Sequence, residues 1–198
     1  MARGCSLVVL AGGLSRRMGR DKATLSAAGQ SLTDRIIERL RPVVDEVIVA
    51  AGTRDLELAV GRSVHDHFPG AGPMAGIHAG LRAAAFDHAW VVACDYPDVD
   101  PGIGRQLIRV VTGFDAAVPL VEGRAQGVCA VYSVGVVSLV ERLIVSGQRS
   151  VTALLESCRV RYLDEAELRP VDPELASFRN LNTPADYEDW VRSRRAPR

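Results

Sequence analysis

The sequence predicts an α/β fold of three layers, with helices covering both faces of a mostly parallel sheet. Short apolar runs alternate along the 198 residues with segments whose apolar residues recur at helical spacing. Continuous apolar runs are typical of strands buried on both faces, and their alternation with helices is typical of parallel sheets with right-handed crossovers. The first run, residues 6–10, is closed by Gly12 and Gly13, as expected where a buried strand turns into a loop.

The remaining elements follow from the same two patterns. Further apolar runs predict strands at residues 46–51, 61–65, 89–94, 115–120, 128–133 and 160–163. Helical spacing predicts helices at residues 31–40, 56–60, 74–85, 101–111, 136–145, 151–156 and 186–192. In open sheets of this kind, ligands bind beyond the carboxyl ends of the strands. The expected binding region is therefore residues 10–22, 50–52 and 94–97.

The composition fits one globular domain spanning residues 1–198. Hydrophobic residues make up 47% of the chain, which argues against disorder. The 24 basic and 24 acidic residues are scattered, so general nucleic-acid binding is not expected. No apolar stretch approaches the roughly 18 residues of a membrane span, and the four cysteines form no CxxC pair. We expect a reduced, cytoplasmic protein with no membrane contact. The sequence does not determine the oligomeric state, and a monomer is the expectation.

A glycine-rich and strongly basic loop follows the first expected strand. Gly12 and Gly13 remove side chains where the backbone must approach a ligand, and free N–H groups in such a loop can cradle phosphate oxygens. Four cationic residues follow between positions 16 and 22, namely Arg16, Arg17, Arg20 and Lys22. A solvated basic turn is the alternative, but this density directly after a buried strand favours a triphosphate. Neither a Walker A loop nor a dinucleotide fingerprint is present at this position.

The segment Leu-Ala-Gly-Gly-Leu-Ser-Arg-Arg-Met-Gly-Arg-Asp-Lys at residues 10–22 resembles the signature of the molybdenum cofactor guanylyltransferases and related nucleotidyltransferases. The resemblance implies a Rossmann-like sheet of the nucleotidyltransferase type. It also implies that Lys22 contacts the phosphates of a bound nucleotide. The residues expected to hold that nucleotide are Leu10, Ala11, Gly12 and Gly13.

A second glycine-rich loop, Pro-Gly-Ala-Gly-Pro-Met-Ala-Gly-Ile, occupies residues 69–77. A glycine pattern alone is weak, and a tightly packed helix entry explains it equally well. The loop nevertheless resembles a second motif of the same family, which lies near the base and sugar of the nucleotide. Asp66, just upstream, matches a nucleotide-contacting aspartate of that family.

Asp95 follows the expected strand at residues 89–94, within the sequence Cys-Asp-Tyr-Pro. A carboxylate at the carboxyl edge of a central strand is costly unless it is hydrogen-bonded or paired with a cation. Mg²⁺ is commonly bound by one or two carboxylates together with substrate phosphates. An ordinary helix N-cap is the alternative. The segment resembles the family's Cys-Asp-x-Pro motif, which makes Asp95 the magnesium ligand.

The late part of the chain carries motifs that favour the molybdopterin branch of the family. Asn180-Leu181-Asn182-Thr183-Pro184 resembles the family's Asn-x-Asn-Thr-Pro, in which Asn182 would orient the acceptor or the waters of the metal. Thr183 and Pro184 can also simply begin a helix. The loop around Arg149 resembles a basic element suited to an anionic acceptor, although a solvated turn is equally possible.

Two departures from the family pattern bear on substrate choice. Gln126-Gly127 stands where the family often has His-Pro or Gln-Pro, which weakens the expected acceptor contact. Residues 50–52, Ala-Ala-Gly, lack the asparagine with which many members help to read the base.

The resemblance implies Mg²⁺-dependent transfer of GMP from GTP to the phosphate of molybdopterin, with release of pyrophosphate. Asp95 would hold the metal, while Arg17 and Lys22 would neutralise the leaving pyrophosphate. The alternatives are the same chemistry with CTP or another phosphorylated acceptor, and a non-catalytic nucleotide-binding paralogue. The expected partners are GTP and a molybdopterin-type acceptor.

Overall fold

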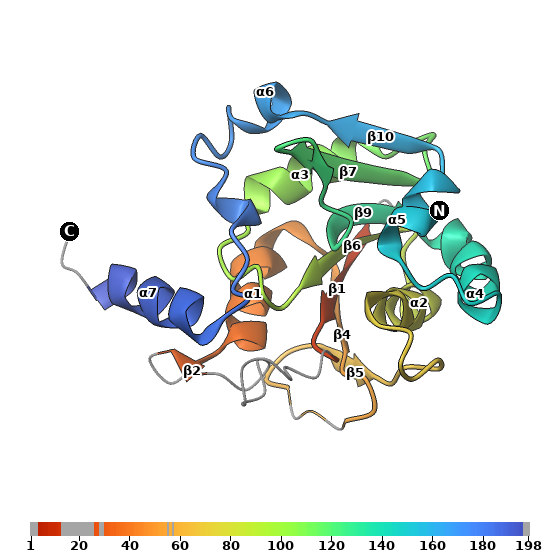
Figure 1. The fold of residues 1–198 in the computed structure, drawn as a ribbon, viewed down its shortest axis with the longest axis horizontal. Coiled ribbons are helices and arrows are strands. Elements are labelled where there is room, and N and C mark those ends of the chain that lie inside the picture. Colours follow the sequence, from red (N-terminus) through yellow and green to blue (C-terminus); the bar gives the residue numbers. More distant parts are fainter. Residues whose placement is uncertain (1–3, 13–25, 28–29, 55, 57, 196–198) are drawn as a thin grey trace.

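The computed structural model describes residues 4–12, 26–27, 30–54, 56 and 58–195, and it has the expected three-layer α/β architecture (Figure 1). The central sheet has the strand order β10-β7-β9-β6-β1-β4-β5, and β8 pairs with β7 beside it. The strands of this sheet are β1 (Cys5–Leu10), β4 (Glu46–Ala50), β5 (Arg62–Val64), β6 (His88–Ala93), β7 (Ala116–Val121), β8 (Arg124–Ala125), β9 (Cys129–Ser133) and β10 (Val160–Leu163). A separate short hairpin is formed by β2 (Ser26–Ala27) and β3 (Gln30–Ser31).

The pairing of the strands is mostly parallel, which confirms the expected sheet. Strand β1 lies between β4 and β6 and runs parallel to both. Strand β9 is antiparallel to both of its neighbours, β6 and β7. The register places Leu10 opposite Ala50 on one side and opposite Ala93 on the other. Three central strands therefore end at the same level, and the loops that follow them share one edge of the sheet.

Helices cover both faces of the sheet (Figure 1). They are α1 (Leu32–Leu40), α2 (Pro73–Ala83), α3 (Pro101–Val110), α4 (Val137–Val145), α5 (Val151–Glu156), α6 (Glu165–Leu168) and α7 (Pro184–Arg195). Leu7 and Val9 of β1 pack into one core, which contains residues of α1 and α3. Val8 packs into a second core, which contains residues of α2, α4 and α5. This alternation along β1 is what burial on both faces requires.

The expected helix at residues 56–60 is wrong. Among the described residues of that range, 56 and 58–60, none is helical. Leu56, Leu58 and Val60 recur at a spacing of two and pack against the first core, which is the periodicity of an extended chain. The other expected strands and helices are present, with ends that shift by a few residues.

The described residues include small elements that the sequence patterns did not reveal. These are the β2–β3 hairpin, β8, α6 and the 3₁₀ turns Arg41–Val43, Val134–Val136 and Ala176–Phe178. Each is too short to show a periodic pattern. In the part of the chain that the structure describes, no helix combines the length and apolar character needed to cross a membrane.

Candidate active site

The ends of the central strands bring several expected site residues together. The Ala11 N–H donates to the Ala50 carbonyl over 2.9 Å, so the chain leaving β1 stays beside the end of β4. On the other side, the Cys94 N–H donates to the Leu10 carbonyl over 3.1 Å. The loop that begins at Gly12 and the turn that holds Asp95 therefore leave adjacent strands. Gly13, Arg17 and Lys22 lie outside the described residues.

Gly12 lies directly against the backbone of the loop that follows β4. A Cβ atom on Gly12 would lie 2.7 Å from the Gly52 nitrogen and 2.9 Å from its Cα. Gly52 itself has φ +72°, which favours glycine. The Ala-Ala-Gly sequence at residues 50–52 thus contributes a backbone contact at the position where many members of the family carry an asparagine.

Asp66 is tied to the same loop. Its N–H donates to the Gly52 carbonyl over 2.7 Å, and one of its carboxylate oxygens, Oδ1, is buried without a hydrogen-bond partner among the described residues. Burial raises the pKa of the Asp66 carboxyl, and the neighbouring His65 and His67 oppose this shift. A carboxylate oxygen that is buried without a partner is a ready acceptor for an N–H or O–H group of a ligand.

Replacing Asp66 with asparagine should stabilise the folded protein near neutral pH. The pKa of Asp66 is raised in the folded state, so its ionisation destabilises the fold as pH rises from about 3.9 through the raised pKa. The stabilising effect of Asp66→Asn should therefore be complete above the raised pKa and vanish below about pH 4. Thermal unfolding of both proteins across this pH range would measure it. Asp189→Asn, at an exposed position on α7, is the control. A stability difference that did not change with pH would contradict the prediction.

Arg54 is a residue of the strand-end region that the sequence motifs missed. Its Nη2 donates to the Ala11 carbonyl, and its Nε lies 3.4 Å from the Ala51 carbonyl. The Arg54 carbonyl in turn lies 3.1 Å from Nε2 of His65, next to Asp66. One guanidinium group thus links the chain leaving β1 to the loop after β4, because a planar fork can serve two acceptors. The only feature of the sequence that could have indicated Arg54 is its position, four residues beyond the end of β4.

Arg54→Met should weaken triphosphate binding by roughly ten- to a hundredfold, since hydrogen bonds from a charged donor contribute about 1.5–3 kcal/mol. The loss should arise from disorder in the Ala11–Gly12 backbone, with little change in overall fold. Isothermal titration with the triphosphate would measure the affinity. Arg109→Met, at an exposed position in the last turn of α3, is the matched control. Equal affinities for the two variants would remove Arg54 from the site.

The turn after β6 places Asp95 next to the late Asn-x-Asn motif. The Leu181 N–H donates to the Asp95 carbonyl over 2.8 Å, which ties a segment 86 residues further along the chain to this turn. Asp95 is half-buried. The described residues hold no group of three His, Cys, Asp or Glu side chains suited to a metal. A carboxylate with nearby amide oxygens instead suits a hard cation such as Mg²⁺ that takes its remaining ligands from substrate phosphates and water.

The two interpretations of the late motif, helix capping and contact with the acceptor or metal, apply to different residues. Thr183 caps α7, because its Oγ1 accepts the Asp186 N–H over 3.1 Å. The Asp186 carboxylate accepts the N–H groups of Asn182 and Thr183 in return. The Asn182 side chain takes no part in this cap and donates to Oδ1 of Asn180 over 2.8 Å. Helix capping thus explains Thr183 and leaves the Asn182 side chain to another role.

The departure at Gly127 has a packing explanation. A Cβ atom on Gly127 would lie 2.4 Å from Cγ1 of Val151, the first residue of α5. The Gln126-Gly127 loop precedes β9, which is antiparallel, so it lies at the carboxyl edge of the parallel strands. The exposed loop that contains Arg149 directly precedes Val151 and reaches the same edge. The two segments that the sequence assigned to the acceptor side thus lie close together at this edge.

In the second glycine-rich loop, each glycine meets a backbone or packing requirement. Gly70 and Gly72 have φ +85° and +63°. A Cβ atom on Gly76 would lie 2.9 Å from Cδ2 of Leu10, so its absence lets α2 pack against the end of β1. The packing interpretation therefore holds for Gly76, and it brings α2 close to the carboxyl edge of the sheet.

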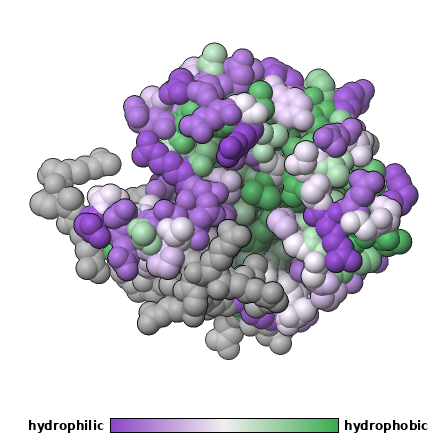
Figure 2. Space-filling view, viewed as in Figure 1, coloured by the Kyte–Doolittle hydropathy of each residue, from purple (hydrophilic) through white to green (hydrophobic). Residues whose placement is uncertain are grey.

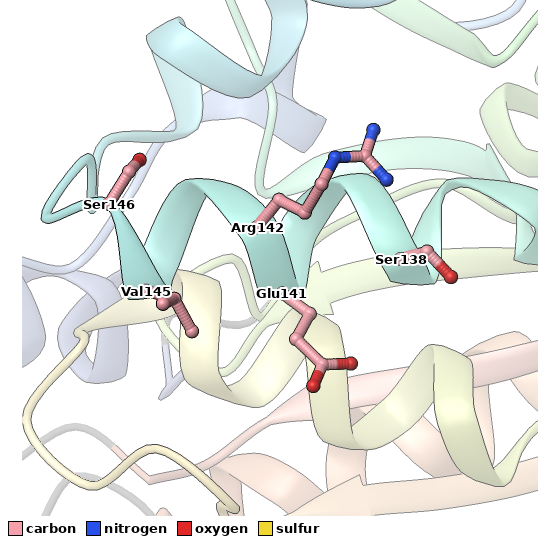
Figure 3. Close-up of a pocket in the computed structure, with 5 residues that line it drawn as sticks. All are labelled: Ser138, Glu141, Arg142, Val145 and Ser146. Atoms are coloured by element: carbon pink, nitrogen blue, oxygen red, sulfur yellow. The ribbon is translucent and has the colours of Figure 1, made fainter.

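The molecular surface shows two different depressions. One face is hollowed near its centre, where apolar residues form the floor and hydrophilic residues lie on both sides (Figure 2). A second depression follows α4 and is lined by Ser138, Glu141, Arg142, Val145 and Ser146 (Figure 3). Glu141 extends from it toward α2, where its Oε2 lies 3.7 Å from Nε2 of buried His78. All five lining residues belong to α4 and its C-terminal cap, so this depression differs from the site at the strand ends.

Comparison with known proteins identifies the family. The family model for the MobA-like NTP transferase domain matches residues 7–166. This chain belongs to that family. A probable molybdenum cofactor guanylyltransferase of Pelotomaculum thermopropionicum is 38% identical over 180 residues, covering 90% of this chain and 88% of the relative. The expected family and enzyme class, a nucleotidyltransferase, are thereby confirmed.

Solved structures of this family and fold agree with the architecture. Molybdopterin-guanine dinucleotide biosynthesis protein A from Archaeoglobus fulgidus superposes with a TM-score of 0.81 at 30% identity, covering 95% of this chain and 97% of that one. A 2-C-methyl-D-erythritol 4-phosphate cytidylyltransferase from Thermus thermophilus superposes with a TM-score of 0.70 at 18% identity, covering 96% and 98%. The second likeness concerns the fold alone. The nucleotidyltransferase fold expected from the sequence is confirmed.

Proposed function

We propose that this protein transfers GMP from GTP to the phosphate of a molybdopterin-type acceptor and releases pyrophosphate. The observation that carries the proposal is the convergence of Gly12, Asp66 and Asp95 at the carboxyl edge of the sheet, in a chain of the MobA-like family. The name of the 38% identical relative supports guanylyl transfer to a molybdenum cofactor.

In the proposed reaction, an oxygen of the acceptor phosphate attacks the α-phosphorus of GTP. A new phosphorus–oxygen bond forms, the bond between the α-phosphorus and its bridging oxygen to the β-phosphate breaks, and pyrophosphate leaves. The protein chiefly positions the two phosphates and stabilises developing charge. Leu10 to Gly13 would hold the nucleotide, Asp66 would contact its nucleoside part, and Asn182 would orient the acceptor side.

Charge on the phosphates would be neutralised from two directions. Arg17 and Lys22 of the basic loop would face the leaving pyrophosphate. Asp95 would hold Mg²⁺, which when bound draws charge from the transferring phosphoryl group. The metal assignment rests on the carboxylate at the end of β6 and on the amide oxygens of the adjacent late motif.

The same chemistry with CTP, or with another phosphorylated acceptor, is the second candidate. Its support is the absence of the base-reading asparagine at residues 50–52 and the Gln126-Gly127 departure. A non-catalytic paralogue is a weaker candidate, because Lys22 and Asp95 are both retained.

Thermal unfolding with GTP, CTP, ATP and UTP, each with and without Mg²⁺, tests the donor. A ligand that binds only the folded state raises its apparent stability. A Mg²⁺-dependent shift with GTP alone, followed by pyrophosphate release when molybdopterin is added, is the expected result. A shift with CTP alone would reassign the donor, and no shift with any nucleotide would contradict the proposal.

A further inference from the structure

The C-terminal helix is attached to the connection that carries Asp95. The indole Nε1 of Trp190, on α7, donates to Oδ2 of Asp98 over 2.8 Å. Asp98 lies three residues after Asp95, in the same connection between β6 and α3. Trp190 is 8% exposed, so its side chain is largely shielded from water. A buried side chain of α7 thus contacts a segment that is distant in the sequence.

The chain that enters α7 is attached to the same connection. The Leu181 N–H donates to the Asp95 carbonyl over 2.8 Å. Leu181 is also buried together with Trp190 and Leu32 in a small third core, between α7 and the adjacent helix α1 (Figure 1). One attachment therefore precedes Asn182 and the other follows it, so the late motif is held from both sides.

Arg35 of α1 fixes the orientation of the Asp98 carboxylate. Its Nη2 lies 3.5 Å from Oδ1 of Asp98, and its guanidinium carbon lies 5.3 Å from the centre of the Trp190 ring. One carboxylate oxygen therefore faces a cation while the other accepts the indole N–H. The Arg35 and Asp98 side chains are 28% and 22% exposed, so water weakens this ion pair less than one on the open surface. The position of α7 is thus tied to α1 and to the Asp95 connection together.

The first turn of α7 transmits this position to Asn182. The Asp186 carboxylate accepts the N–H groups of Asn182 and Thr183 over 2.9 and 2.7 Å. The Thr183 hydroxyl accepts the Asp186 N–H in return. The backbone of Asn182 therefore belongs to the cap of the helix that carries Trp190. Because the hydrogen-bonded backbone of a short helix moves as a unit, the direction of α7 determines where Asn182 lies.

We propose that Trp190 and Asp98 are positioning residues that, through α7, hold Asn182 beside the Asp95 turn for the acceptor. This inference rests on the proposed function, which places Asn182 on the acceptor side. The small third core needs only an apolar side chain at position 190, and a phenylalanine would supply one. The indole N–H adds a directional contact with a charged acceptor, and this contact falls on the connection that carries Asp95.

Trp190→Phe removes the indole N–H and keeps an aromatic ring in the small third core. In steady-state transfer to molybdopterin, we expect kcat/KM for the acceptor to fall by about tenfold and the KM for GTP to change by less than about twofold. The expected nucleotide contacts come from β1 and the loop after β4, not from α7. Val191→Ala is the matched control, because Val191 packs against the same core and its truncation leaves the hydrogen bond in place. An equal fall in Val191→Ala would attribute the effect to a loosened helix and overturn the inference.

A double-mutant cycle tests whether the two residues act as a pair. Asp98→Ala should lower kcat/KM for the acceptor by itself, and adding Trp190→Phe should have little further effect, because the hydrogen bond is already absent. Effects that simply multiplied would contradict the inference. Asp98→Ala leaves the aromatic ring of Trp190 in the core, so it tests the inference even if Trp190→Phe fails to fold.

Hydrogen exchange provides a readout that needs neither substrate nor metal. The Leu181 N–H is bonded to the Asp95 carbonyl, so its exchange rate reports whether the late motif stays on that turn. In ¹⁵N-labelled protein, we expect this N–H to exchange about tenfold faster in Trp190→Phe and Asp98→Ala, and at the wild-type rate in Val191→Ala. An unchanged rate in the first two variants would overturn the inference even if the wild type transferred GMP. Faster exchange in these variants of a protein that transfers no GMP would contradict only the proposed function.

Discussion

Asp95→Asn should lower the rate of transfer by about a thousandfold, because it removes the charge expected to hold the metal at the transferring phosphate. The fold should survive the change. The link from Leu181 uses the Asp95 backbone carbonyl, which asparagine retains, and asparagine is close to aspartate in size. Pyrophosphate release at saturating GTP and Mg²⁺ would measure the rate, and thermal unfolding would check the fold.

Asp87→Asn is the matched control for Asp95. Asp87 is exposed and precedes β6, so it lies at the opposite end of the same strand. This variant should keep the wild-type rate. A rate for Asp95→Asn within a few-fold of wild type would remove Asp95 from the chemistry.

Gly12→Ala should weaken nucleotide binding by more than about tenfold. The new Cβ atom would lie 2.7 Å from the Gly52 nitrogen, and backbone cannot move aside as a flexible side chain can. Relieving such a contact costs typically about 1–3 kcal/mol and would separate the chains that leave β1 and β4. Because Asp66 hydrogen-bonds to the Gly52 carbonyl, the displacement would reach two expected nucleotide contacts at once.

Isothermal titration with GTP and Mg²⁺ would measure this loss, which we expect to exceed about tenfold in affinity. Gly135→Ala is the control, since a Cβ atom there would meet only Oγ of Ser133, at 3.4 Å. Nucleotide affinity that was equal in both variants would show that the Gly12–Gly52 contact is unimportant for binding.

Much of the candidate site could be predicted because its signals are local. Asp95 follows a recognisable buried strand, and a residue in that position must emerge at the carboxyl edge whatever the order of the strands. Asn182 and Asp66 were proposed from short motifs, and so was the basic loop with Arg17 and Lys22, which lies outside the described part of the chain. The roles of all these residues remain predictions.

The roles of Arg54 and Trp190 could not be predicted, because each is defined by contacts with distant parts of the chain. Arg54 reaches a carbonyl 43 residues away, and Trp190 reaches a carboxylate 92 residues away. Neither residue type carries a pattern that predicts such a contact. The expected helix at residues 56–60 failed for a related reason. Five residues show too little periodicity to separate helix from extended chain, and packing against the first core decided between them.

The local sequence was sufficient for the fold class, for most of the strands and helices, and for the glycine-rich and basic character of the loop after β1. Hydrophobic periodicity and glycine placement are properties of neighbouring residues, so they can be recognised without knowledge of the fold. Strand order, register and the crossovers are global properties, and they alone brought Gly12 against Gly52 and Asn182 beside the Asp95 turn. Tertiary packing therefore decided which polar groups share one site. The burial of apolar side chains sets the order of the strands, and each buried hydrogen-bond donor must then have an acceptor nearby.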